Sequence, residues 1–412
     1  MTEREAQQLL QLAHAAIKTQ HHDSALGLVS RVIAMEAELP SPTEFDGQRH
    51  HRLVATAVAM AVDAQVALGQ GERALEMARR YWVEDPVDPY VAGALVRALV
   101  SAAGAVGALD AFKLVERRRA SAPDDDPSVP VCMTICRNEM QQLPSFLEHH
   151  RRIGVRRFIV VDNGSTDGTL EHALGQPDVD VWTSDLSFRA LAFGANAFTA
   201  IAHLELRGRW LLLLDADERF VPPQAGEDLR SIVSALDADG LEALAGTLLD
   251  VYDAQPLLAS RGPVPLDLEG QVFFDRVWSH TAYSDAGPFA NGTHLAGGVR
   301  CRVFGSSPVF LLSKVPLVKF TSGRLLVGGQ HDSNTPSRLR SQHHAGLLHT
   351  KFLGATDRLD VQATRGEFAN AASDYVSYTN TLTSMPNLTL YDPAMSIRYE
   401  GADQLLALGI AR

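Results

Sequence analysis

Residues 210–220 read WLLLLDADERF, and this stretch decides the fold. The five leading apolar residues are typical of a short β-strand that is buried on both faces. Three carboxylates, on Asp215, Asp217 and Glu218, follow the apolar run almost at once. Negative charge collects beside a buried segment only where a counter-ion balances it. The stretch therefore predicts a cation site at the end of a core strand.

The sequence before residue 210 alternates between short apolar strands and helices. From residue 131 the strands read VCMTIC, RFIVVD and VDVWTS, with helical patterns between them. This alternation predicts a parallel sheet that helices cover on both faces. Ligands of such sheets bind beyond the carboxyl ends of the strands. Asp215 and Asp217 are predicted to lie there.

Asp215 and Asp217 are two positions apart, so in an extended chain their side chains face the same way. Carboxylate oxygens suit Mg²⁺ or Mn²⁺, with substrate phosphates completing the coordination. In the alternative interpretation, Asp217 caps a helix that follows. The two prolines of RFVPP disfavour a helix at that point.

The composition indicates a soluble protein with two domains. The chain has 412 residues, a formal net charge of −12 and three cysteines. The negative charge argues against a general nucleic-acid binder. Cys132, Cys136 and Cys301 are too few for a disulfide framework and are expected to be buried thiols in a reducing compartment. With a polar N-terminus and no apolar run of about 18 residues, we expect a cytoplasmic protein without a membrane span.

Residues 1–120 show helical spacing throughout. The segment 64–89, AQVALGQGERALEMARRYWVEDPVDP, looks like a tetratricopeptide repeat, and two or three degenerate hairpins are expected. A plain helical bundle is the alternative. Residues 121–129 have the composition of a linker, 130–385 form the predicted catalytic domain, and 386–412 are expected to be a C-terminal tail.

Residues 131–169, VCMTICRNEMQQLPSFLEHHRRIGVRRFIVVDNGSTDGT, together with LLLLDADERF, resemble the family 2 glycosyltransferases of the GT-A fold. The resemblance extends to about residue 382 and includes GGVRCRVF, KVPLV and LLHTKFL. It implies an α/β fold with a doubly wound sheet, preceded here by an all-α helical-repeat domain. It also implies a nucleoside-diphosphate sugar as the donor substrate.

Residues that leave the first three strands are expected to surround the donor. Asp162 ends the second strand, where its carboxylate can accept a hydrogen bond from a uracil-type N–H or a ribose hydroxyl, or can cap the turn instead. Arg189 and Asn196 follow the third strand and could meet the ribose or diphosphate, although a loop arginine is often only solvated. The predicted donor-binding residues are Thr134, Arg137, Asn138, Glu139, Asp162, Arg189, Asn196 and Asp215.

The resemblance assigns the cation to Asp217, with Asp215 on the ribose or the cation. Enzymes of this fold commonly add a late histidine, for which His331 and His349 are the candidates. Lys351 follows closely and would balance the charge of the leaving diphosphate. Four other histidines are expected on helix surfaces: His149, His150, His343 and His344.

The base that accepts the proton of the acceptor hydroxyl is expected among the acidic residues of the second half. Asp250, Asp253 and Asp275 are the candidates and Asp332 is a fourth, with a slight preference for Asp253 near a strand end. The segment GGVRCRVF is expected to be a short strand that places Arg300 and Arg302 on one face, towards an anionic acceptor or the diphosphate.

These features predict an inverting, metal-dependent glycosyltransferase that acts in polysaccharide or glycoconjugate synthesis. Its acceptor would be a glycan, a lipid-linked molecule or a protein, and the helical repeats could bind a protein partner. One alternative is a metal-dependent nucleotidyltransferase, although CRNEMQQLP lacks the expected glycines of a phosphate loop. The other is a non-catalytic interaction protein with a degenerate transferase domain.

Overall fold

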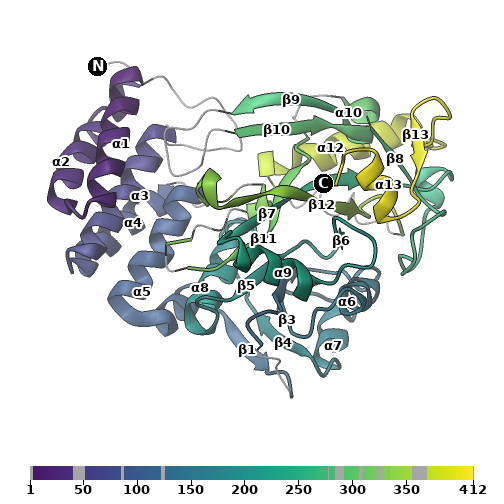
Figure 1. The fold of residues 1–412 in the computed structure, drawn as a ribbon, viewed down its shortest axis with the longest axis horizontal. Helices are drawn as coiled ribbons and strands as arrows, with labels where there is room; N and C mark the ends of the chain where they lie inside the picture. Colours follow the sequence, from purple (N-terminus) through teal and green to yellow (C-terminus); the bar gives the residue numbers. More distant parts are fainter. Residues whose placement is uncertain are drawn as a thin grey trace.

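The computed structural model describes residues 3–39, 52–84, 88–121, 126–276, 278–283, 292–305, 310–354 (other than 322, 325, 327, 332 and 334) and 369–411. The protein is a mixed α/β molecule in which a helical N-terminal region lies beside a large mixed sheet (Figure 1). Asp332, one of the predicted bases, lies outside the described residues.

The N-terminal region is a series of helices in which each described helix packs on the next. They are α1 (Glu3–Lys18), α2 (His22–Ile33), α3 (Arg52–Ala67), α4 (Gly71–Glu84) and α5 (Pro89–Ala111), with a 3₁₀ turn, η1, at Glu36–Glu38. Gly69 has a positive φ of 73° and reverses the chain between α3 and α4. The α3–α4 hairpin coincides with the repeat-like segment of the sequence.

The sheet has nine strands in the order β1-β4-β3-β2-β5-β11-β7-β12-β6. Their bounds are β1 (Val115–Arg118), β2 (Val131–Cys136), β3 (Phe158–Asp162), β4 (Val179–Thr183), β5 (Trp210–Leu213), β6 (Glu218–Val221), β7 (Ala243–Asp250), β11 (Ser313–Lys319) and β12 (Arg340–His349). Strands β4, β3, β2 and β5 are parallel, as the alternation predicts. The expectation of a parallel sheet is wrong beyond β5, because β11 runs antiparallel to both β5 and β7.

The chain after β2 adds further helices and two small sheets. Its helices are α6 (Leu143–Arg152), α7 (Thr169–Leu174), α8 (Ala195–Glu205), α9 (Leu229–Ala238), α10 (Gly298–Phe304), α12 (Ala369–Ser384) and α13 (Ala402–Ala407). The small sheets pair β8 (Phe273–Asp275) with β13 (Ser396–Arg398) and β9 (Trp278–Tyr283) with β10 (Gly292–Gly297). Three further 3₁₀ turns are η2 (Leu257–Ala259), η3 (Gly328–Gln330) and η4 (Ser337–Leu339).

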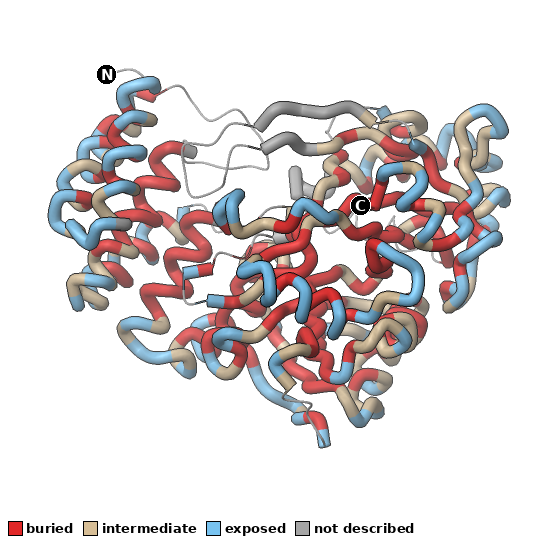
Figure 2. The backbone as a smooth tube through the Cα atoms, viewed as in Figure 1, coloured by how far each residue is buried: buried red, intermediate tan, exposed pale blue. Residues whose placement is uncertain are grey.

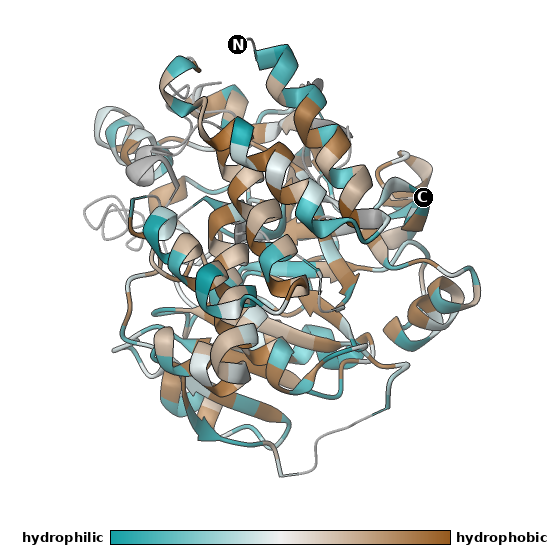
Figure 3. Cartoon of the chain, turned by 90° about the vertical axis from the view of Figure 1, so that its left-hand side faces the viewer, coloured by the Kyte–Doolittle hydropathy of each residue, from teal (hydrophilic) through white to brown (hydrophobic). Residues whose placement is uncertain are grey.

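One hydrophobic core joins the helical region to the sheet. It includes Leu99 of α5, Ile201 of α8, and Met133 and Leu211 of the sheet, all of them buried. A second core lies on the opposite face of the sheet, under α6 and α9, and includes Leu212. Buried residues accordingly fill the sheet and the inner helices in Figure 2, while Figure 3 shows the mixed polar and apolar outer side of the helical region.

Helix α5 is apolar over 22 residues, with a mean hydropathy of 1.7 from Tyr90 to Ala111, and is long enough to cross a membrane. This differs from the expectation that no apolar run reaches that length. Half of the apolar segment is buried inside the protein, and α5 packs on α3, α4 and α8. Its apolar character is therefore that of a core helix.

Three segments differ from the sequence-based expectations. Residues 115–118 are not helical but form the edge strand β1, which pairs with β4. The predicted strand GGVRCRVF is helix α10, which begins at Gly298, a glycine with a left-handed φ of 71°. The C-terminal segment is not a loose tail, because Leu405 and Ile410 are buried in a core with strands of the main sheet.

The cysteines agree with the expectation of free thiols. Cys132 and Cys136 are buried, and Cys301 is half-buried.

Candidate active site

The acidic stretch forms a turn at the end of the central strand β5. The Glu218 N–H donates a hydrogen bond to the Asp215 carbonyl at 3.0 Å, and strand β6 begins at Glu218. Asp217 therefore caps no helix, and the alternative interpretation is wrong. The expectation of an extended chain between Asp215 and Asp217 is also wrong, since the two residues lie in a tight turn.

A buried lysine is the counter-ion of one side of this turn. Lys314 of β11 donates a hydrogen bond to Asp215 Oδ2 at 3.2 Å and another to the Glu218 carboxylate. The Glu218 side chain is 1% exposed and that of Lys314 is 3% exposed. The Asp215 N–H also donates to Glu218 Oε2 at 3.2 Å. These contacts fix the turn, and the single positive charge of Lys314 is shared by the carboxylates of Asp215 and Glu218.

The pKa values of this group follow from burial. Desolvation raises the pKa of Glu218 to about 7, against the opposing attraction of Lys314. Burial alone would lower the pKa of Lys314, but the carboxylates of Asp215 and Glu218 raise it above its ordinary value. Lys314 therefore remains a cation at neutral pH.

A second set of charges lies on the other side of the turn. Sheet pairing places His349, the last residue of β12, opposite Asp250 of β7 and opposite Glu218 of β6. His349 Nε2 is 3.3 Å from Asp217 Oδ2, and His349 Nδ1 is 2.6 Å from Asp250 Oδ1. Arg300 of α10 donates from Nε to Asp250 Oδ2 at 2.7 Å.

Electrostatics within this second set favour the charged forms. Burial opposes ionisation of Asp250, but Arg300 and His349 together lower the pKa of Asp250 to about 2. Burial likewise opposes the charged form of His349, and the carboxylates of Asp217 and Asp250 raise its pKa. Asp250 is therefore an anion whose two oxygens already have partners.

One carboxylate and one imidazole of this second set could together hold a divalent cation. Asp217 offers a carboxylate oxygen, and His349 would offer its Nε2 once that nitrogen has lost its proton. Asp250 holds the other ring nitrogen, as carboxylates commonly do behind metal-bound histidines. The described residues contain no group of three or more acidic, histidine or cysteine ligands. A two-residue site suits Mg²⁺ or Mn²⁺, which substrate phosphates and water complete. Asp215 is instead paired with Lys314.

Asp162 lies at the end of β3 and has one oxygen without a protein partner. Its Oδ2 accepts hydrogen bonds from the N–H groups of Gly164 and Ser165, both at 3.1 Å, so it caps the turn. Its Oδ1 is buried and has no partner. The hydroxyl of Thr134, on the neighbouring strand β2, is buried in the same unpartnered way. Such atoms are expected where a polar ligand completes a site.

The loop after β2 is held against the DNGSTDGT turn. The Asn138 N–H donates to Ser165 Oγ at 2.9 Å, and Asn138 Oδ1 accepts from the Thr166 N–H at 2.7 Å. The Glu139 N–H donates to Thr169 Oγ1 at 2.9 Å. Asn138 therefore serves this loop structurally, whereas Arg137 is half-buried beside it.

Arg189 and Asn196 belong to the segment after β4. Asn196 is buried and donates from Nδ2 to the Ala190 carbonyl at 3.3 Å, so it braces this loop. Arg189 is half-buried. Helix α8 begins only at Ala195 because Ala192, Phe193 and Gly194 have positive φ angles of 48°, 54° and 94°.

Two other predicted bases, Asp253 and Asp275, have structural roles. Asp253 accepts hydrogen bonds from the Gln255 N–H and the Ser260 hydroxyl, so it caps a loop. Asp275 is buried, accepts from the Tyr252 hydroxyl and forms a two-point ion pair with Arg302 of α10.

The two late histidines occupy different places. His349 belongs to the second set of charges, with Asp217, Asp250 and Arg300, which we call the charge cluster. His331 instead places Nδ1 2.9 Å from the Ser313 carbonyl, beside the start of β11. Lys351 is near the cluster and donates to the Tyr375 hydroxyl of α12 at 2.9 Å.

The four remaining histidines are not on helix surfaces. On α6, His149 Nε2 lies 2.8 Å from the Phe220 carbonyl, and the Phe220 N–H donates to His150 Nε2 at 3.2 Å. His343 and His344 lie on strand β12.

The sequence analysis did not identify Asp374 and the tyrosines of α12 as neighbours of the charge cluster. Asp374 is half-buried and interacts electrostatically with Lys351 and Arg300. Tyr375 and Tyr378 are buried next to α10, and Tyr378 packs on Phe304 with ring centroids 4.6 Å apart. The only signal in the sequence is the helical spacing of YVSY.

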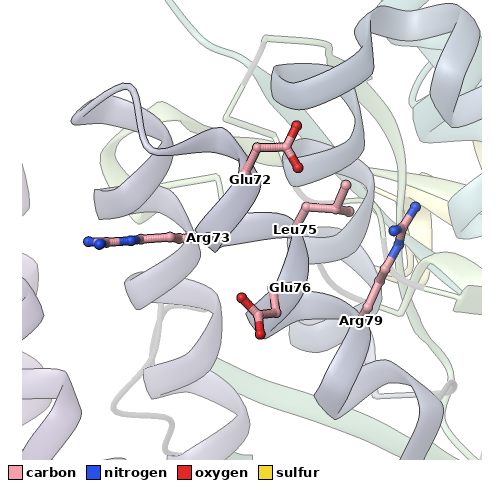
Figure 4. A pocket seen from close by; sticks show the side chains of 5 residues that line it. All are labelled: Glu72, Arg73, Leu75, Glu76 and Arg79. Carbon is pink, nitrogen blue, oxygen red and sulfur yellow. The ribbon is translucent and has the colours of Figure 1, made fainter.

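A separate hollow lies in the helical region (Figure 4). It is lined by residues of α4: Glu72, Arg73, Leu75, Glu76 and Arg79.

Comparisons with known proteins give little guidance. No protein-family model matches the chain, and no curated protein matches it. Among solved structures the chain is similar to a mutant of the Thermobaculum terrenum O-GlcNAc transferase, with 18% sequence identity and a TM-score of 0.14. The similarity covers 45% of this chain and 42% of that one, less than half of either length.

Proposed function

We propose that this protein is a metal-dependent, inverting glycosyltransferase of family 2 with a GT-A fold. The observation that carries the proposal is the pairing of Asp217 with His349 at the end of the central strand, with Asp250 behind the histidine. Mg²⁺ or Mn²⁺ would be held by Asp217 and His349 together with the donor diphosphate. When bound, the cation stabilises the charge that develops on the departing nucleotide.

The chain's own residues have distinct roles in this proposal. Asp162 Oδ1 and the Thr134 hydroxyl, buried without partners, bind the base or ribose of the donor. Asp215, whose side chain is 43% exposed, meets the ribose while Lys314 fixes its position. Lys351 adds positive charge near the leaving diphosphate. An acceptor hydroxyl attacks the anomeric carbon from the opposite face in a single displacement, which inverts the configuration.

The wider setting follows the same proposal. The acceptor is a glycan, a lipid-linked molecule or a protein, in polysaccharide or glycoconjugate synthesis. Three free cysteines support a reducing, cytoplasmic compartment. The helical region shares a core with the sheet, so its first role is to support the catalytic part, and its outer face is available for a protein partner.

A donor panel tests the proposal. The purified protein is incubated with UDP-, GDP-, dTDP- and CDP-sugars, with Mn²⁺ or EDTA, and nucleoside diphosphate release is measured. We expect slow, Mn²⁺-dependent hydrolysis of one donor class. Release of pyrophosphate from a nucleoside triphosphate would instead identify a nucleotidyltransferase. Absence of nucleotide binding with and without metal would favour a non-catalytic interaction protein.

Asp217→Ala should lower Mn²⁺-dependent donor turnover at least about 100-fold, since the variant loses a cation ligand. The fold should persist, because the Asp217 backbone carbonyl, not its side chain, accepts the Thr350 hydrogen bonds at 2.7 and 2.9 Å. Turnover and thermal unfolding are measured side by side. Asp403→Ala, which changes an exposed residue of α13, is the control. Full activity in Asp217→Ala would remove the assignment.

A further inference from the structure

The three described aspartates that were predicted as bases are all engaged by other groups. Asp250 is bound at both oxygens, by His349 and Arg300. Asp253 caps a loop, and Asp275 is buried in an ion pair. A general base must instead have a carboxylate oxygen free to meet the acceptor hydroxyl. None of the three meets that requirement.

A fourth aspartate, Asp374, lies on helix α12 beside the charge cluster. It is half-buried, and no described residue donates a hydrogen bond to its carboxylate. The next residue, Tyr375, accepts the hydrogen bond from Lys351 and places the Lys351 ammonium 4.6 Å from its ring centroid. Because Lys351 follows His349 by two positions, this contact brings the part of α12 around Tyr375 close to the predicted cation site.

Helix α12 turns the side that holds Tyr375 and Tyr378 into the protein, and Asp374 directly precedes Tyr375. Tyr378 is one helical turn further on, on the same side of the helix. It is fully buried against Phe304 of α10, and its hydroxyl has no hydrogen-bond partner. Arg300, on the same helix as Phe304, stacks over Phe310 at 4.9 Å. Arg300 and Lys351 thus lie within electrostatic reach of Asp374 and Tyr378.

The charges that act on Asp374 come from three other elements. Burial raises the pKa of Asp374 above its ordinary value, Lys351 at the end of β12 and Arg300 of α10 oppose that rise, and Asp250 of β7 adds to it. Tyr375 and Tyr378 are the other titratable groups on this part of α12. A carboxyl with a raised pKa is a stronger base once ionised than an ordinary aspartate.

We propose that Asp374 is the general base of the transfer reaction. The acceptor oxygen forms a bond to the anomeric carbon while its proton passes to an Asp374 carboxylate oxygen. The bond between the anomeric carbon and the diphosphate oxygen breaks, and its electron pair leaves with the nucleoside diphosphate. Lys351 and Arg300 keep the base ionised before the proton arrives. This inference rests on the proposed function and names a residue that the sequence motifs do not contain.

Donor hydrolysis tests the inference without knowledge of the acceptor, because water also needs a base. The full chain is assayed with UDP-glucose, UDP-N-acetylglucosamine, GDP-mannose and dTDP-glucose plus Mn²⁺. For the donor that is turned over, Asp374→Asn should lower kcat at least about 100-fold. KM for the donor and Kd for the nucleotide with Mn²⁺ should stay within about twofold of the wild-type values.

Two further readouts separate a base from a structural residue. The rising limb of the plot of log kcat against pH should disappear in Asp374→Asn, and Asp374→Glu should restore part of kcat together with that limb. Asp403→Asn makes the same chemical change on the exposed face of α13 and should behave as wild type.

The inference is overturned if Asp374→Asn keeps kcat within about threefold of wild type with an unchanged pH profile. It is also overturned if that variant loses nucleotide affinity in proportion to kcat, because Asp374 would then bind the donor. If the wild-type protein itself neither binds nor hydrolyses any donor, the proposed function fails, and the inference fails with it.

Discussion

At the scale of single residues, Asp215 and Asp217 have different electrostatic partners although they are two positions apart. Lys314 neutralises Asp215 from β11, and His349 faces Asp217 from β12. The sequence correctly marks this stretch as a place that needs positive charge. It cannot say which positive charge, because Lys314 lies 99 positions beyond Asp215, His349 lies still further along the chain, and both reach the turn only through sheet pairing.

Asp250→Asn tests the role of the residue behind His349. An amide holds the ring less firmly and does not stabilise its charge, so the affinity for Mn²⁺ in the presence of the nucleotide should fall about 10- to 100-fold. Binding is followed by the electron paramagnetic resonance signal of free Mn²⁺.

Asp275→Asn is the matched control for that experiment. Asp275 is also a buried aspartate that pairs with an arginine of α10, but it lies outside the charge cluster. Both variants should lose stability, whereas only Asp250→Asn should lose Mn²⁺ affinity. Equal Mn²⁺ binding by the two variants would show that Asp250 does not position His349.

At the scale of elements, the local sequence pattern predicted the strands and helices whose formation depends on neighbouring residues. The apolar runs of β2, β3, β4 and β5 and the helices between them lie where the alternation predicts them. The pattern did not predict that β11 enters between β5 and β7 in the opposite direction, since strand order depends on contacts between distant segments. It also misjudged α10, because GGVRCRVF alternates like a strand while Gly298 starts a helix.

Helix α8 carries a buried histidine that makes the protein sensitive to acid. His203 lies near Phe320, its two ring nitrogens have no partner, and burial, helped by Arg207 and Arg97, lowers its pKa to about 4. A lowered pKa means that the folded state binds fewer protons than the unfolded state. The stabilising contribution is complete above the ordinary pKa of 6.5 and is lost as the pH falls towards 4.

His203→Leu should therefore lose less stability than wild type when the pH falls from 8 to 4.5. The free energy of unfolding is measured by urea titration at several pH values, and the difference between the two proteins is compared. His149 and His150 are present in both proteins and cancel in that difference. Parallel curves for the two proteins would contradict the prediction.

At the scale of the whole molecule, the helical region and the sheet are not independent bodies. Residues of α3 and α5 belong to the same core as residues of α8, β2, β5 and β11. A region that only recruited partners would share little apolar surface with the sheet. The repeat-like sequence is therefore used here to cover one face of the sheet.

Removal of residues 1–111 should expose that face and make the remaining chain aggregate. Soluble yield and size-exclusion chromatography measure the outcome. Removal of residues 1–21 alone, which takes away α1, should leave a soluble protein with a lower Tm, because α1 packs on α2 and α3. A monomeric 112–412 fragment with native near-ultraviolet circular dichroism would show that the two regions fold separately.

Lys314 has a consequence for the handling of this protein. An ammonium group that is covalently part of the chain cannot be dialysed away, so the acidic turn keeps a resident cation even in EDTA. Chelation would then remove a cation from the proposed site at Asp217 and His349 and leave the fold intact. The metal-free protein could then be stored and supplied with Mg²⁺ or Mn²⁺ as the experiment requires.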